Sequence, residues 1–230
     1  MTLATAHATA VGSTSGMILI STGEAEKSAG SIVIRTGDST SDIGGSISVV
    51  VGSSEKSGGA ITLSAGESNS ETGGAVTITT GLGAATSSGD MTLATANGVG
   101  SGISGTIVMS SGTTIGGNSG AVFIGSGTSS SGNSGQISIV VGSTVSGQGG
   151  DVLIAAGNSA SFTSGAVKIV SGDAGDAKNS GSVTMASGSS ASGATGLLLL
   201  STGVSSGATG SMYLVTGSSS GATTGDIFIE

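Results

Sequence analysis

The sequence predicts an all-β protein: a parallel β-solenoid of about sixteen repeats of about 15 residues each. Three observations support this prediction. A short apolar segment recurs at nearly constant spacing, apolar residues alternate within it, and polar linkers rich in Gly, Ser and Thr separate the copies.

The recurring apolar segment is seven residues long and usually ends in Gly, as in SIVIRTG (31–37) and AVTITTG (75–81). Further complete copies begin at residues 17, 46, 60, 90, 106, 121, 136, 151, 166, 182, 197 and 211, and partial copies lie at residues 1–6 and 226–230. Self-similarity at a fixed spacing is typical of repeat architectures.

Within the segment, positions 2 and 4 are always Ile, Val, Leu or Met, as at Ile107 and Met109, and position 6 is small or β-branched. This period of two, rich in β-branched residues, predicts a strand with one buried face. An α-helix would require apolar residues three and four positions apart. The core is therefore expected at positions 2 and 4, for example at Ile124.

The linkers are almost entirely small and polar, and each ends in Gly, from Gly16 and Gly30 to Gly210 and Gly225. These glycines are expected either to take a positive φ or to allow a close backbone approach at a corner.

Similar strands at constant spacing can stack in register, each covering the apolar pair of its neighbour, which favours the solenoid over an antiparallel meander. Residues 24–52 and 53–81 repeat the same order of two segments and two linkers, with Glu-Lys in the first linker of each. This order favours two strands in a coil of about 30 residues. A coil of about 15 residues with one strand is the alternative.

The composition excludes several functional classes. The chain has 230 residues, 46 Gly and no Cys, Pro or Trp, but its hydrophobic content of 36% is too high for ordinary disorder. A net charge of -8 with only five dispersed basic residues argues against nucleic acid as a partner. No apolar run is long enough for a membrane span. Residues 1–230 are expected to form one continuous array, a fragment of a longer one, because both ends fit the apolar segment.

Catalytic and metal-binding patterns are weak, so neither an enzyme nor a cofactor is predicted. His7 is the only histidine and lies near the N-terminus. The G-x-S-x-G match at 217–221 and the G-x-G-x-x-G match at 100–105 lack a following helix. The carboxylates of Asp38, Asp42, Glu67 and Glu71 could line one edge and hold Ca²⁺, but a solvated edge is favoured, since no calcium motif accompanies them. Asp173 and Asp176 are interpreted in the same way.

The small-Gly-x-Φ-x-Φ-x-small-Gly pattern, in which Φ is apolar, resembles the low-complexity Gly/Ser/Thr repeats of large extracellular surface proteins and viral fibre proteins. The solenoid interpretation resembles insect hyperactive antifreeze proteins. These resemblances imply shafts, adhesive or protective fibres, or ice binding, at an extracellular, cell-surface or virion-surface location. A regular outward Thr array, which ice binding requires, is interrupted: Thr62, Thr77 and Thr92 are followed at the same position by Val108 and Phe123.

Position 3 of the segment holds many large apolar residues for a face bathed in water. We expect a face for lateral packing that includes Leu19, Val33, Val108, Phe123, Leu153, Leu199, Tyr213 and Phe228. The predicted function is a non-enzymatic structural repeat of an extracellular fibre, shaft or surface layer that self-associates by strand stacking and lateral packing into a filament. The alternative is a binding module for ice or carbohydrate, which would give the chain glycan partners.

Overall fold

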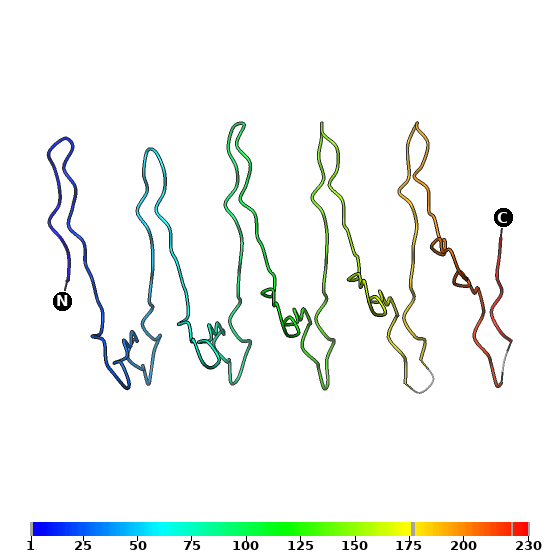
Figure 1. Cartoon of the computed structure of the whole chain (residues 1–230), viewed down its shortest axis with the longest axis horizontal. Coiled ribbons are helices and arrows are strands. Elements are labelled where there is room, and N and C mark those ends of the chain that lie inside the picture. The colour runs from blue at the N-terminus through cyan, green and yellow to red at the C-terminus, as the bar shows by residue number, and fades with distance from the viewer. Residues whose placement is uncertain (1, 176–177, 222, 230) are drawn as a thin grey trace. The chain divides into compact units, whose positions relative to one another are not determined.

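The computed structural model of the chain describes residues 2–175, 178–221 and 223–229. Within these residues the backbone forms neither a helix nor a strand. Extended segments alternate with loops that turn the chain back on itself (Figure 1). The chain divides into two units, Met1–Ser110 and Ser111–Glu230, and both contain this alternation.

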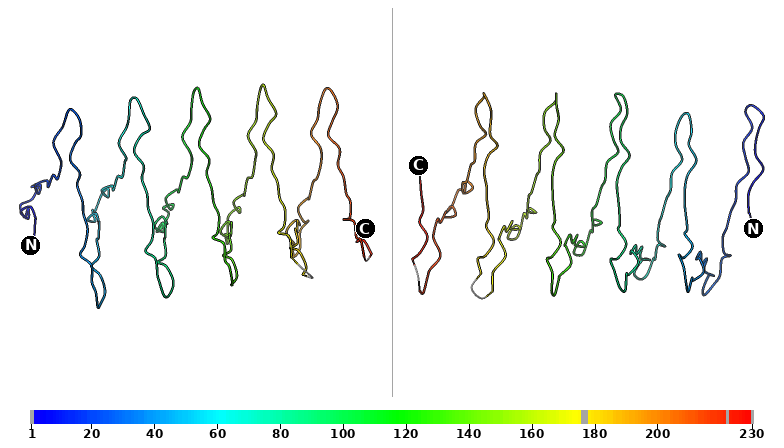
Figure 2. Two further views of the ribbon diagram at one scale, coloured as in Figure 1. Left: turned by 90° about the horizontal axis from the view of Figure 1, so that it is seen from below. Right: turned by 180° about the vertical axis from the view of Figure 1, so that it is seen from behind.

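The prediction of an all-β parallel solenoid is therefore wrong, for coils of about 30 residues and of about 15 residues alike. A strand requires a neighbour about 4.8 Å away that pairs with its backbone N–H and C=O groups. The backbone hydrogen bonds of the described residues instead join the ends of loops or close single turns, such as the one from the Gly165 N–H to the Gly157 carbonyl oxygen. Figure 2 shows the extended segments from two other sides.

The predicted core is also absent: no described residue is buried. Ile124, which we expected between stacked strands, is 69% exposed. The physical reason lies in the composition of the repeat. Each repeat offers only a few large apolar side chains, whereas its many Gly residues lose more conformational entropy on folding than any other residue type.

The alternation within each segment nevertheless persists as alternating exposure. Around Val140, which is 82% exposed, Val141 at position 6 is 42% exposed. Position 2 is likewise less exposed than position 3, as for Val122 next to Phe123. Successive side chains of an extended chain point to opposite sides, so positions 2, 4 and 6 share one side of the segment.

The side chain at position 6 meets the glycine that ends the following loop. A Cβ placed on Gly59 would lie 2.7 Å from Cγ1 of Val51, and one placed on Gly150 would lie 3.0 Å from Cγ1 of Val141. The same contact, at up to 4.0 Å, recurs at Thr5 and Gly16, Thr22 and Gly30, Thr36 and Gly45, Ala65 and Gly74, Thr80 and Gly89, Thr95 and Gly105, Ser111 and Gly120, Ser126 and Gly135, Ala156 and Gly165, Ser171 and Gly181, Ser187 and Gly196, and Thr202 and Gly210.

This contact explains why the loops end in glycine. Among the described glycines, only Gly12 and Gly100 have a positive φ, and neither of them ends a loop. Close approach is thus the correct one of the two expectations. Three of the five least exposed described residues, Thr5, Thr95 and Ala156, occupy position 6 at such a contact.

Hydrogen bonds reinforce the base of several loops. The Gly74 N–H donates to the Gly66 carbonyl oxygen at 2.8 Å, and the Gly89 N–H donates to that of Gly81 at 3.1 Å. At another loop, the Thr22 hydroxyl donates to the Gly30 carbonyl oxygen at 3.2 Å. Residues eight positions apart are thereby joined, so the chain reverses its direction locally without pairing into a sheet.

Candidate functional site

Seven loops of eight residues contain a hydroxyl group that organises their backbone. In loop 143–150, the side-chain oxygen of Thr144 accepts a hydrogen bond from the Gly147 N–H at 3.1 Å. The hydroxyl belongs to the second loop residue and the N–H to the fifth. The same pair recurs at Ser39 and Asp42, Ser68 and Glu71, Thr114 and Gly117, Ser129 and Gly132, Ser159 and Phe162, and Ser190 and Gly193.

Two of the three loops of seven residues, 53–59 and 204–210, use the same hydroxyl but a nearer donor, whereas loop 24–30 has Ala25 in this place. The Lys56 N–H donates to Ser54 Oγ at 3.2 Å, and the Gly207 N–H donates to Ser205 Oγ at 3.0 Å. In both cases the hydroxyl again belongs to the second loop residue, and the donor follows two residues later. Such bonds to nearby backbone groups are how Ser and Thr stabilise turns.

In two of the loops that have no hydroxyl in this place, a backbone carbonyl accepts instead. The Gly102 N–H donates to the Val99 carbonyl oxygen at 3.1 Å, across Gly100, whose φ is 62°. Ser13 donates both its N–H and its hydroxyl to the Ala10 carbonyl oxygen, across Gly12 at a φ of 78°. Glycine suits these two turns because other residues rarely adopt a positive φ.

The residues predicted for lateral packing are all strongly exposed. Their exposed fractions lie between 72% for Leu199 and 92% for Phe123. Leu19, Val33 and Val108 belong to the first unit, and Phe123, Leu153, Leu199, Tyr213 and Phe228 belong to the second. Most of the surface of each side chain is open to solvent, and their role in packing stays a prediction.

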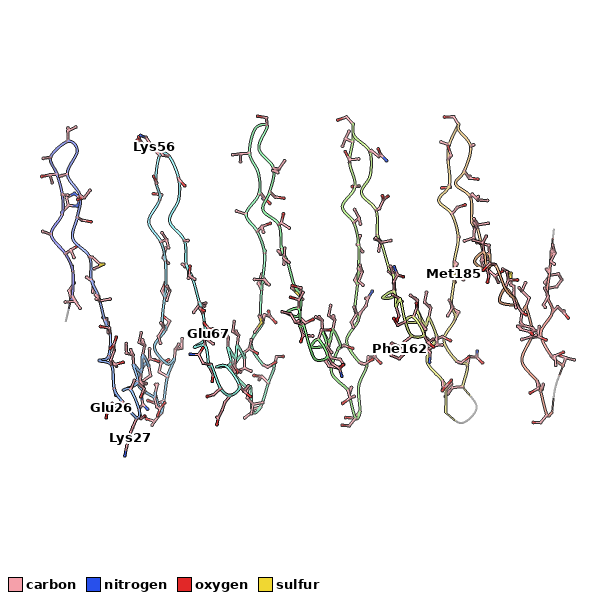
Figure 3. All side chains as sticks on the ribbon, viewed as in Figure 1. Glu26, Lys27, Lys56, Glu67, Phe162 and Met185 are labelled. Carbon is pink, nitrogen blue, oxygen red and sulfur yellow. The ribbon has the colours of Figure 1, made fainter. Side chains whose placement is uncertain are left out.

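Polar and charged side chains gather on the loops. Figure 3 shows Glu26 and Lys27 projecting from one loop, Lys56 at the tip of another, and Phe162 on a loop of the second unit. The carboxylate of Asp42 accepts a hydrogen bond from the adjacent Ile43 N–H at 2.8 Å, within its own loop. Its oxygen therefore stabilises the turn.

The described residues form no enclosed site. They contain no pocket, and no three His, Asp or Glu side chains come close enough to hold a metal ion. Asp38, Asp42, Glu67 and Glu71 are thus not brought together as a calcium site would require, and Asp176 lies outside the described residues. His7 is exposed, as expected of a histidine near the N-terminus.

Our sequence reasoning missed the hydroxyl at the second position of the loops. The signal was present, because Ser39, Ser68, Ser129 and Ser159 all stand two residues after the end of an apolar segment. The small, polar composition of the linkers alone does not distinguish this position from the others.

The described residues include no helix that could cross a membrane. Comparison of the chain with protein-family models, curated proteins and solved structures found no match.

Proposed function

We propose that this chain is a non-enzymatic structural repeat protein of an extracellular fibre, shaft or surface layer, and that it self-associates through its apolar segments. The observation that supports this proposal most directly is the exposure of every large apolar side chain in the described residues, from Leu3 to Ile229. Soluble monomers rarely leave large contiguous apolar patches in water.

The exposed area gives the size of the driving force. The chain has an accessible surface of 22621 Å² at a mass of 21.1 kDa. A compact monomer of this mass exposes about 9,000 Å². The difference is several times the roughly 1,600 Å² that a stable protein–protein interface buries in total. Association can therefore bury apolar surface that the single chain leaves in water.

The backbone of the segments supports the same proposal. Segment 136–142 is extended, and the described structure gives its N–H and C=O groups no ladder partner. Unpaired groups of this kind are a template for pairing with another chain. No Pro interrupts such pairing anywhere in the sequence.

The extracellular location rests on the resemblance of the repeats to those of surface and fibre proteins. Many exposed Ser and Thr hydroxyls fit a surface that is hydrated between its apolar segments, and they could carry O-linked sugar.

Sedimentation velocity and electron microscopy at several concentrations test the proposal. We expect the full chain to form larger species as its concentration rises, and to form elongated particles. A monomer that persists at every concentration would contradict self-association. Ice or glycan binding by that monomer, measured by thermal hysteresis or on glycan arrays, would then establish the alternative function.

A further inference from the structure

We propose that residues 121–172 form the surface on which a second copy of this chain docks, with the same segments of the two copies side by side and in register. This inference rests on the proposed function and gives self-association a place and a geometry. It follows from the spacing, the charge and the exposure of these residues, all of which belong to the second unit.

The spacing in this region is constant. Its segments begin at residues 121, 136, 151 and 166, and loops of eight residues separate them. The hydroxyls of Ser129, Thr144 and Ser159 each accept a hydrogen bond from the N–H three residues later. Because the loops have equal length and the same internal bond, all four segments are followed or preceded by the same local turn, and one kind of contact can recur at each of them.

The charge in this region suits contact between identical chains. Asp151 and Lys168 are its only charged residues, so its net charge is zero. Residues 24–71, in contrast, carry seven acidic and three basic side chains, a net charge of -4. An in-register contact places each charge beside the same charge of the other copy, and like charges directly opposite are destabilising. The contact is thus unfavourable at 24–71 and little opposed at 121–172.

The exposed side chains provide the contact area. Phe123 and Leu153, at position 3 of their segments, are among the most exposed apolar residues of the region. A segment of seven extended residues is about 23 Å long, and with side chains reaching about 10 Å, four segments offer roughly 900 Å². This area is close to the roughly 800 Å² that each partner contributes to a stable interface.

Charge exchange at position 3 tests the register directly. One full-length variant combines Phe123→Glu with Leu153→Glu, and a second combines Phe123→Lys with Leu153→Lys. In register, each new charge faces itself in the other copy, so each variant alone should assemble at an about tenfold higher concentration than the unaltered chain. An equimolar mixture places Glu beside Lys and should restore assembly, as measured by sedimentation. A mixture as impaired as either variant alone would overturn the in-register contact.

A matched control uses segments 17–23 and 31–37, which flank the first charged loop of residues 24–71. Leu19→Glu combined with Val33→Glu alters position 3 of two exposed segments in the first unit. We expect this variant to change the assembly concentration by less than about threefold. If the control impairs assembly as much as the variants at 123 and 153 do, self-association stands but its placement at 121–172 is wrong. If the unaltered chain never assembles, both the placement and the proposed function fail.

Discussion

Segments 46–52 and 136–142 are nearly the same peptide in two different surroundings. They read SISVVVG and QISIVVG, and Val51 and Val141 at position 6 have the same exposed fraction, 42%. The loop after the first segment has seven residues and contains Glu55 and Lys56, whereas the loop after the second has eight and is uncharged.

This comparison separates what the segment determines from what the loop determines. Equal exposure at position 6 follows from the segment, since both loops return their last glycine to the valine. The distance at that return differs between the two loops but does not follow loop length alone, since after the seven-residue loop 204–210 a Cβ on Gly210 would lie 4.0 Å from Cγ2 of Thr202. A Cβ on the final glycine would lie 2.7 Å from Val51 after the shorter loop and 3.0 Å from Val141 after the longer one. The N–H that donates to the loop hydroxyl also differs: it lies two residues after Ser54 in the shorter loop and three residues after Thr144 in the longer one.

The largest expected effect is that of proline on assembly. Ser138→Pro removes an N–H that the single chain does not use but that pairing with a second copy requires. An unpaired carbonyl in the other copy costs about 1–3 kcal/mol, so the concentration needed for assembly should rise roughly ten- to a hundredfold. Sedimentation velocity measures this change.

Ser48→Pro is the matched control, because Ser48 occupies the same position in the twin segment. It should change the assembly concentration by less than about threefold, since the charged region is not expected to pair. Equal effects of the two proline substitutions would remove the distinction between the regions.

A smaller effect, on loop closure, is expected from adding a Cβ to the glycine that ends the loop. Gly59→Ala forces its Cβ against the stiff side chain of Val51 and should cost about 1 kcal/mol of loop closure. Gly150→Ala should cost less, given its longer distance from Val141. The nuclear Overhauser effect between the Val51 methyl groups and residue 59 should weaken in Gly59→Ala.

The neighbouring glycine is the control for this substitution, because a Cβ on Gly58 would meet nothing within 4 Å. Gly58→Ala should leave the signal unchanged. Adding Val51→Ala to Gly59→Ala should restore closure in part, because a Cβ on Gly74 would lie 3.3 Å from the alanine at position 6, compared with 2.7 Å from Val51 for a Cβ on Gly59. Failure of this rescue would show that the side chain at position 6 does not set the requirement for glycine.

Deleting Val145 tests whether the length of the loop affects the contact between Val141 and Gly150. Val145 is fully exposed, and its removal shortens loop 143–150 to seven residues. We expect Gly150→Ala, introduced into this deletion variant, to weaken the contact with Val141 as strongly as Gly59→Ala weakens the contact with Val51. If Gly150→Ala is as mild in the shortened loop as in the original one, loop length does not control the tightness of closure.

The smallest expected effect concerns the hydroxyl within the loop. Thr144→Val replaces the acceptor of the Gly147 N–H by a methyl group at nearly constant shape. Water reaches this exposed N–H, so the loss should be about 0.5 kcal/mol, or an about twofold faster hydrogen exchange at Gly147. Thr144→Ser keeps the acceptor and should exchange as the original chain does.

The sequence was sufficient to predict the extended segments and the loops, but not their pairing. Alternating apolar residues, as at Val122 and Ile124, predict which side chains share a side of the segment, and the exposure pattern agrees. Whether two segments pair depends on whether the gain from burial exceeds the entropy lost by a Gly-rich chain, and a local pattern does not contain that balance. The contact between position 6 and the last glycine joins residues about nine apart, so it could be read only by aligning the loops with their segments.

Because each loop closes on its own segment, the number of repeats can change by mutation without disturbing the other loops. The contact between Ser126 and Gly135, like the bond between Gly165 and Gly157, involves residues of a single segment and the loop that follows it. Duplication or loss of one 15-residue repeat therefore leaves every other closure intact. The number of repeats can therefore increase or decrease while the other repeats keep their sequence. Selection can thus change the length of the array independently of the local structure of each repeat.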